Sequence, residues 1–301
     1  MSNATCTAAR RDVAADITAK ILASLGQGLM PWRKPWDGAR AGLALPRRVG
    51  GEPYRGVNTI MLWHASAAHG YASPYWLTFN QAIKLGAHVR KGERGELVVY
   101  YGSAKHAERA ADGTEIETAF RFLKSYAAFN ADQIEGLPER FHPRPREDAP
   151  IPLDAHERWF ARLDIDRILT RDIACYIPSR DVIGMPPLAA FDSDETYAAT
   201  LNHEAVHATA APHRVGRDLS KRFQQAIAAE ELVAEIGAAI LGAHLNLPPD
   251  HICDHAAYIE NWMSILRSDK RAFFHAAARA QAAVDWLLAK SPAPEAAHVQ
   301  A

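Results

Sequence analysis

The segment His203-Glu204-Ala205-Val206-His207 constrains this chain more than any other feature, because it is an H-E-x-x-H pattern inside a predicted helix. Histidines four residues apart on a helix lie on one face, one turn apart, where both imidazoles can bind a single metal ion. Glu204 lies beside them and can accept a proton from a water molecule at the metal. The pattern predicts a catalytic metal site; the alternative is a pair of solvated or buried histidines without a metal.

The helix that carries this pattern has start and stop signals of its own. It is expected from about Asp194 to Ala211, ahead of Pro212. Asp192 or Ser193 is the expected N-cap, with Glu195 completing a possible capping box. Alanines beside the histidines allow another element to pack closely against this helix.

A third metal ligand is expected from the stretch Glu230–Glu235, because a catalytic zinc site has three protein ligands and an open position. At about 100° per residue, Glu231 and Glu235 share a helix face lined by alanine and glycine, whereas Glu230 lies elsewhere. Burying two carboxylates on that face is costly without a cation. We therefore predict that Glu231 binds the metal, Glu235 orients a ligand histidine, and Glu230 is solvated. A surface acidic stripe is the alternative.

Proline marks a boundary in the middle of the chain. Residues 137–152 contain five of the 18 prolines and six charged residues, which predicts a semi-rigid linker or strap. The expected domains are residues 1–136 and residues 153–301. Residues 1–136 hold 17 Lys and Arg against 12 Asp and Glu, whereas the rest of the chain holds 17 against 23. The basic front half is expected to meet an anionic partner, unless its charges are only solvated.

Apolar periodicity predicts an α+β fold class: a small helix-plus-hairpin domain, then a mostly helical domain with a small sheet. In the front half the expected elements are helices at Asp12–Leu25, Val57–Ala68 and Thr78–Leu85, and strands at Leu97–Gly102 and Ala119–Phe129 joined by a turn at Ala111-Asp112-Gly113. In the second half they are helices at His156–Leu163, Gln225–Leu245, Ala256–Ser268 and Lys270–Leu288, and short strands at Ala174–Ile177 and Val182–Met185.

The front half combines aromatic and basic residues in a way that is typical of single-stranded DNA binding. Bases stack on exposed aromatic rings, and Lys and Arg neutralise phosphates. The residues expected in this interface are Trp32, Arg33, Lys34, Trp36, Tyr54, Arg55, Trp76, Arg90 and Lys91. Trp63 is instead expected in the core. Buried tryptophans with merely solvated cations are the alternative, and no sequence motif for reading duplex DNA is present.

Longer stretches of the sequence resemble the family of ArdC-type antirestriction proteins. In the second half these stretches are Ala174-Cys175-Tyr176, Asp181–Pro186, Tyr197–Leu201, His203–Thr209 and Glu230–Glu235. In the first half they are Pro31–Trp36, Tyr54–Asn58, Trp76–Ala82 and Phe129–Ile134. Ala210-Ala211 departs from the family at a place where a glycine is expected, which affects the local turn and not the metal ligands.

The resemblance implies a protein encoded by a plasmid or another mobile element that shields incoming DNA from host restriction. It implies an N-terminal domain that binds single-stranded DNA and is shared with TraC-type primases, followed by a gluzincin-like metallopeptidase domain that holds Zn²⁺, Mn²⁺ or another divalent metal. His203, His207 and Glu231 would hold this metal, with Glu204 as general base and then acid. An oxyanion donor is also required, and either Tyr176 or the pair His213-Arg214 can supply it. A host restriction-system protein is a candidate substrate.

Composition excludes other classes of protein. No stretch approaches 18 uninterrupted apolar residues, the N-terminus has no apolar signal core, and three scattered cysteines suit a reducing compartment. We therefore expect a cytoplasmic protein without a membrane partner.

Alternative functions remain open at this stage. One is a non-proteolytic protein that binds single-stranded DNA and has a structural metal site, and another is an accessory protein of plasmid replication or priming. An intact Glu204 favours the enzyme, because a structural site needs no base. A nuclease or primase is less favoured, because there is no second carboxylate cluster for two-metal chemistry. A second i,i+4 pair, His251 and His255, lacks an obvious base and is expected to be a solvated helix start.

Overall fold

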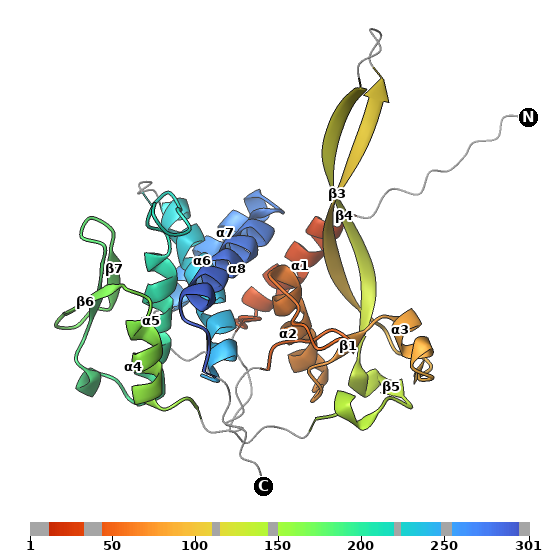
Figure 1. Ribbon diagram of the computed structural model, residues 1–301, viewed down its shortest axis with the longest axis horizontal. Coiled ribbons are helices and arrows are strands. Elements are labelled where there is room, and N and C mark those ends of the chain that lie inside the picture. The colour runs from red at the N-terminus through yellow and green to blue at the C-terminus, as the bar shows by residue number, and fades with distance from the viewer. Residues whose placement is uncertain are drawn as a thin grey trace, which may run out of the picture.

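The computed structural model describes residues 12–32, 44–109, 115–143, 150–219, 224–247 and 255–294. It is an α+β protein with small sheets, which confirms the predicted fold class (Figure 1). The front half contains α1 (Val13–Leu25), α2 (Val57–His69), β1 (Trp76–Leu77), α3 (Phe79–Lys84), β2 (His88–Val89), β3 (Glu96–Arg109), β4 (Glu115–Asn130) and β5 (Ile134–Glu135). The helices begin where the sequence places their caps: the Asp12 side chain accepts from the Ala15 amide, and Thr78 forms a capping box with Gln81.

Strands β3 and β4 form a long antiparallel hairpin that extends well beyond the helices in Figure 1. Their pairing begins at Glu96 opposite Ala128 and continues to Arg109 opposite Glu115. Both strands are longer than the sequence predicts. The end of the hairpin that extends away from the helices has no core to face, so its sequence lacks the alternating apolar pattern by which a strand is predicted. The predicted turn at residues 111–113 lies outside the described residues.

The second half contains α4 (Leu153–Ala161), β6 (Asp166–Leu169), β7 (Cys175–Ile177), β8 (Val182–Met185), α5 (Asp194–Ala208), α6 (Gln224–Leu245), α7 (His255–Ser268) and α8 (Ala272–Lys290). Its sheet has the order β6-β8-β7, so β7 lies at an edge. The N-cap of α5 is Ser193, which accepts from the Thr196 amide, so the predicted capping box with Glu195 is wrong. Helix α5 also ends at Ala208, three residues earlier than expected.

The largest hydrophobic cluster joins residues from both halves of the chain. It includes Ile17, Ile21 and Leu25 of α1 together with apolar residues of α5, α6, α7 and α8. Outside this cluster, Phe141 in the proline-rich stretch is buried, and the Ser73 hydroxyl donates to its carbonyl. The part of that stretch around Phe141 therefore packs against the front half.

Trp32 shows most clearly how the halves are joined. Its side chain is fully buried, with its ring centroid 5.7 Å from that of Trp262 and 6.0 Å from that of Phe273. The expectation that Trp32 stacks on bases at the surface is therefore wrong. Packing this large ring against α7 and α8 removes its apolar surface from water, which stabilises the fold and favours the buried position over an exposed one.

Candidate metal centre

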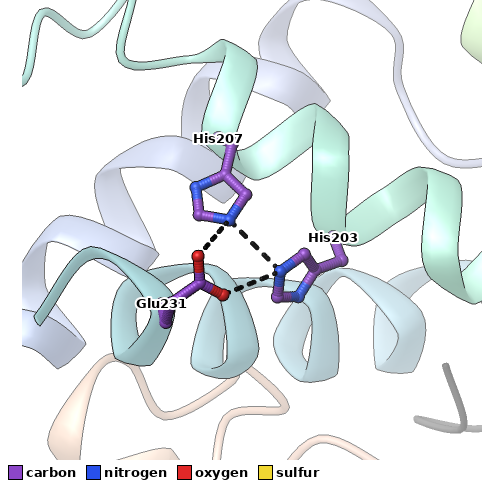
Figure 2. A group of neighbouring side chains, drawn as sticks. All are labelled: His203, His207 and Glu231. Carbon is purple, nitrogen blue, oxygen red and sulfur yellow. Dashed lines mark hydrogen bonds and ion pairs between the residues drawn. The ribbon is translucent and has the colours of Figure 1, made fainter. Parts of the chain in front are cut away.

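Two helices bring the predicted ligands together. Helix α5 presents His203 and His207, and α6 presents Glu231, so that their side chains point toward one another in Figure 2. The Nε2 atoms of the two histidines are 3.2 Å apart. The Glu231 carboxylate oxygens lie 3.5 Å from His203 Nε2 and 3.5 Å from His207 Nε2. All three donor atoms lie within 4.8 Å of one another.

These separations fit a single divalent ion. In a tetrahedral zinc site with bonds of about 2.0–2.1 Å, neighbouring donor atoms lie about 3.3–3.4 Å apart. The two histidine Nε2 atoms, 3.2 Å apart, are close to that spacing, and each of the two Glu231 oxygens lies 3.5 Å from one of these nitrogens. Two imidazoles and one carboxylate are also a donor set of the kind that catalytic zinc sites use.

Small side chains allow α5 and α6 to approach closely enough for this arrangement. A Cβ atom at Gly237 would lie 2.8 Å from Val206 Cγ1, so only glycine fits where the helices meet. Ala205, next to Val206 on α5, and Ala234, three residues before Gly237 on α6, are also fully buried. Ala210 and Ala211 after α5 are buried without a left-handed backbone, so the turn does not need the expected glycine.

The side chains of the site shift one another's pKa values, and His207 has to give up its proton before it can bind a metal. Burial alone would raise the pKa of Glu231, but hydrogen bonds and charge from His203 and His207 hold this pKa far below its usual range. Burial alone would lower the pKa of His207, but Glu230 and Glu231 raise it well above its usual value. The Glu231 carboxylate is therefore ionised, which is the form that binds a cation.

Glu230 is not solvated, so that prediction is wrong. Its carboxylate accepts from Arg217 Nη2 at 2.6 Å and lies 3.4 Å from His207 Nδ1. Arg217 in turn donates to the Thr209 hydroxyl and to the Val206 carbonyl. Although burial would raise the pKa of Glu230, His207 and Arg217 lower it. The crossing of the two helices brings Glu230 to the far nitrogen of His207, which helical angles on α6 alone do not reveal.

Glu204 and Glu235 are also placed by these helices. Glu204 is 6% exposed and lines a cleft of about 870 Å³ together with the two histidines and Glu231. Glu235 lies one turn beyond Glu231 on α6 and is buried. Its role in orienting a ligand histidine stays a prediction.

Asp181 also lines the cleft and holds three neighbouring side chains. Its carboxylate accepts from the Tyr176 hydroxyl at 2.7 Å and from both terminal nitrogens of Arg214, at 2.7 and 3.0 Å. His213 Nε2 lies 3.4 Å from the same carboxylate and its side chain is 63% exposed. Burial and the hydrogen bond to Asp181 raise the pKa of Tyr176 to about 12, so this hydroxyl keeps its proton.

Comparison with known proteins matches both halves of the chain. Residues 154–279 match a family described as zincin-like metallopeptidase, and residues 11–129 match the N-terminal domain of the anti-restriction factor ArdC. The crystal structure of antirestriction ArdC protein from plasmid R388 is 41% identical and covers 93% of this chain and 98% of that one, with a TM-score of 0.80. The chain belongs to the ArdC family of antirestriction proteins.

A second structure of that ArdC protein and two further relatives are similar to this chain over most of its length. The Mn(II)-bound structure of the R388 ArdC protein matches with a TM-score of 0.78 at 42% identity, covering 93% and 98% of the two chains. Uncharacterized protein y4eC of Sinorhizobium fredii is 40% identical over 93% of this chain and 92% of its own length. DNA primase TraC of Escherichia coli is 33% identical over 91% of this chain, which spans 27% of that primase.

In this ArdC-family chain, two more of the aromatic residues expected at the DNA interface are buried. Tyr54 is 3% exposed and Trp76 is 1% exposed, both in a cluster with Leu62 and Val98. The expectation that these rings are open to bases is therefore wrong, because the sheet and α2 cover them. Trp63 is buried, as predicted.

The basic residues expected at this interface differ in placement. Arg55 pairs with Asp285 of α8, and Arg90 pairs with Glu93 at 2.8 Å. Lys91 is exposed. Arg33, Lys34 and Trp36 lie outside the described residues. Within the part of the chain that the structure describes, no helix is both long and apolar enough to cross a membrane.

Proposed function

We propose that this ArdC-family chain binds single-stranded DNA through its front half and hydrolyses peptide bonds at the metal centre, thereby protecting incoming plasmid DNA from restriction. The observation that most supports the enzyme is the convergence of His203, His207 and Glu231 beside Glu204 in one cleft. The similarity to the ArdC N-terminal domain and to TraC supports the DNA-binding part.

The cleft supplies the groups that peptide hydrolysis requires. A divalent ion held by His203, His207 and Glu231, with Zn²⁺ proposed and Mn²⁺ as the alternative, would act as a Lewis acid there. Glu204 takes a proton from the attacking water and then donates it to the leaving amine. Strand β7 contributes Cys175 and Tyr176 to the same cleft and lies at a sheet edge, so an extended peptide can pair with it.

His213 is the better candidate for stabilising the oxyanion. The Tyr176 hydroxyl already donates to Asp181, so its proton is directed away from substrate. His213 lies in the cleft with one ring nitrogen near Asp181, and this contact orients the ring so that the other nitrogen can serve as a donor. Arg214 is buried and committed to Asp181 and the Ala208 carbonyl.

The test of this function is Glu204→Gln in the full chain. The substitution removes the general base and leaves the three metal ligands intact. We expect unchanged metal content and DNA binding, loss of cleavage of a labelled casein probe, and loss of protection when a plasmid is transferred into a restricting recipient. Transfer into a recipient without restriction enzymes is the matched control.

The same experiment addresses the non-proteolytic alternative. If Glu204→Gln retains full protection, the metal has a structural role and protection comes from coating the DNA. A host restriction-system protein is the proposed substrate class, and its disappearance in cells that carry the intact chain, but not the Glu204 variant, would identify it.

A further inference from the structure

The two faces of the β3–β4 hairpin differ where it leaves the body of the protein. Directly paired residues of an antiparallel hairpin share a face. The pairs Tyr100–Lys124 and Gly102–Phe122 therefore lie on the same face as Tyr126, which pairs with Val98. We call the side chains of Tyr100, Phe122, Lys124 and Tyr126 the ring face. Tyr101 lies on the opposite face, with its ring centroid 6.3 Å from that of Phe274.

The ring face is open to solvent. Tyr100 is 56% exposed and Tyr126 is 36% exposed, although tyrosine rings are favourable to bury. The centroids of Tyr100 and Phe122 are 6.4 Å apart, and Lys124 Nζ lies 4.9 Å from the Phe122 centroid. Three neighbouring rings with a cation among them therefore lie on one exposed strand surface.

Gly102 determines how the Phe122 ring lies. A Cβ atom at Gly102 would be 2.3 Å from Phe122 Cζ and 2.9 Å from Tyr100 Cε1. The Phe122 ring therefore lies across the glycine backbone, in space that any other residue would fill. This leaves a flat aromatic surface beside Tyr100 rather than a raised side chain.

The ring face continues onto the body of the protein toward a second cation. Tyr126 lies near Tyr54, whose pKa is raised by burial and by the neighbouring Tyr126. The guanidinium carbon of Arg48, an exposed residue, lies 5.3 Å from the centroid of the Tyr54 ring. The exposed rings are thus flanked by Lys124 on the hairpin and by Arg48 on the body.

We propose that the ring face, extended by Arg48, is the surface on which single-stranded DNA binds, an inference that rests on the DNA binding proposed above. Rings accept unstacked bases, and cations flanking them neutralise the backbone phosphates. Duplex DNA fits less well, because its bases are already stacked on one another. In this proposal the bases stack on the exposed rings of the ring face and not on the buried Trp32, Tyr54 and Trp76, which DNA cannot reach.

The test uses the full chain and fluorescence anisotropy with a labelled oligothymidine. Replacing Tyr100 or Tyr126 with alanine is expected to weaken binding about 5- to 150-fold for each ring that stacks a base. Tyr126→Phe keeps the ring and is expected to bind like the unmodified chain. Tyr101→Ala, a similarly exposed tyrosine on the opposite face, is the matched control and is expected to change nothing.

Three other outcomes would overturn the inference, and they are distinguishable. Binding by the unmodified chain that survives Tyr100→Ala and Tyr126→Ala together would place the DNA elsewhere and leave the proposed function standing. No binding of oligothymidine by the unmodified chain would overturn the proposed DNA binding itself. A dimer in sedimentation that dissociates on Tyr100→Ala, without an effect on DNA, would make the ring face an interface between two copies.

Discussion

The metal centre and the aromatic residues of the front half were both predicted from residue types, yet only the first arrangement is found as expected. His203, His207 and Glu231 converge with their ligand atoms within 4.8 Å of one another, whereas Trp32, Tyr54 and Trp76 are buried. Metal ligands on a helix are fixed by local spacing, because i and i+4 side chains always share a face. Whether an aromatic ring faces water is decided by residues far away in the chain.

The contrast is sharpest at Trp32, where replacement by alanine should have the largest effect. Removing a fully buried Trp from its place between Trp262 and Phe273 should lower the free energy of unfolding by about 3–5 kcal/mol. Urea unfolding followed by circular dichroism measures this change.

Trp32→Phe is the matched control for that experiment. The indole nitrogen of Trp32 is buried and has no hydrogen-bond partner among the described residues, so phenylalanine loses volume but no hydrogen bond. We expect a cost well below that of Trp32→Ala, because most of the ring is kept. If Trp32→Ala leaves stability unchanged but weakens DNA binding, Trp32 is a surface residue in solution and the contrast between the regions disappears.

Glu231→Ala should abolish most metal binding, because it removes one of three ligands. The loss of affinity should exceed the roughly 100-fold upper range for residues that only orient ligands. Titration of the apoprotein with Zn²⁺ by calorimetry gives the affinity. An unchanged affinity would mean that another carboxylate completes the site.

Glu230→Gln should have a smaller effect on the same measurement, about 10- to 100-fold. The substitution keeps the size of the side chain but removes the charge that faces Arg217 and His207 Nδ1. Glu235→Ala is expected in the same range if Glu235 orients a histidine. Should Glu230→Gln lose more affinity than Glu231→Ala, the assignment of ligand and orienting residue must be reversed.

Asp181→Asn should have the smallest effect, about 1 kcal/mol of stability at neutral pH, since Asp181 is partly exposed. Burial raises the pKa of Asp181, but hydrogen bonds from Arg214 and Tyr176 outweigh it and lower this pKa below its ordinary value of 3.8. Because the pKa of Asp181 is lower in the folded protein than in the unfolded chain, its ionised carboxylate stabilises the fold at any pH above the unfolded-state pKa. That stabilisation is lost as the pH falls through the folded-state pKa.

The difference in unfolding free energy between the parent chain and Asp181→Asn should therefore be constant near pH 7 and should shrink below about pH 4. Urea unfolding at both pH values provides the comparison. A difference that persists unchanged at low pH would show that the charge of Asp181 does not hold the cleft wall.

The three candidate ligands could be predicted from the sequence because the position of each on its own helix follows from local spacing, and Glu231 was distinguished from Glu230 by its angle on α6. The contact of Glu230 with His207 could not be predicted from the sequence, because it depends on how α6 crosses α5. Strand β6 (Asp166–Leu169) was missed because it has only four residues, of which two are charged, and because it is held in place by pairing with β8. The ring face was missed for a similar reason, since its members meet only through the register of the hairpin.

The most direct test is a crystal structure of the protein soaked with Mn²⁺, with anomalous scattering used to locate the ion. The account predicts one strong peak bound by Nε2 of His203, Nε2 of His207 and the carboxylate of Glu231, with Glu230 in contact with Arg217 and not with the metal. A peak bound by Glu230, a peak at His251 and His255, or no peak between α5 and α6 would contradict it.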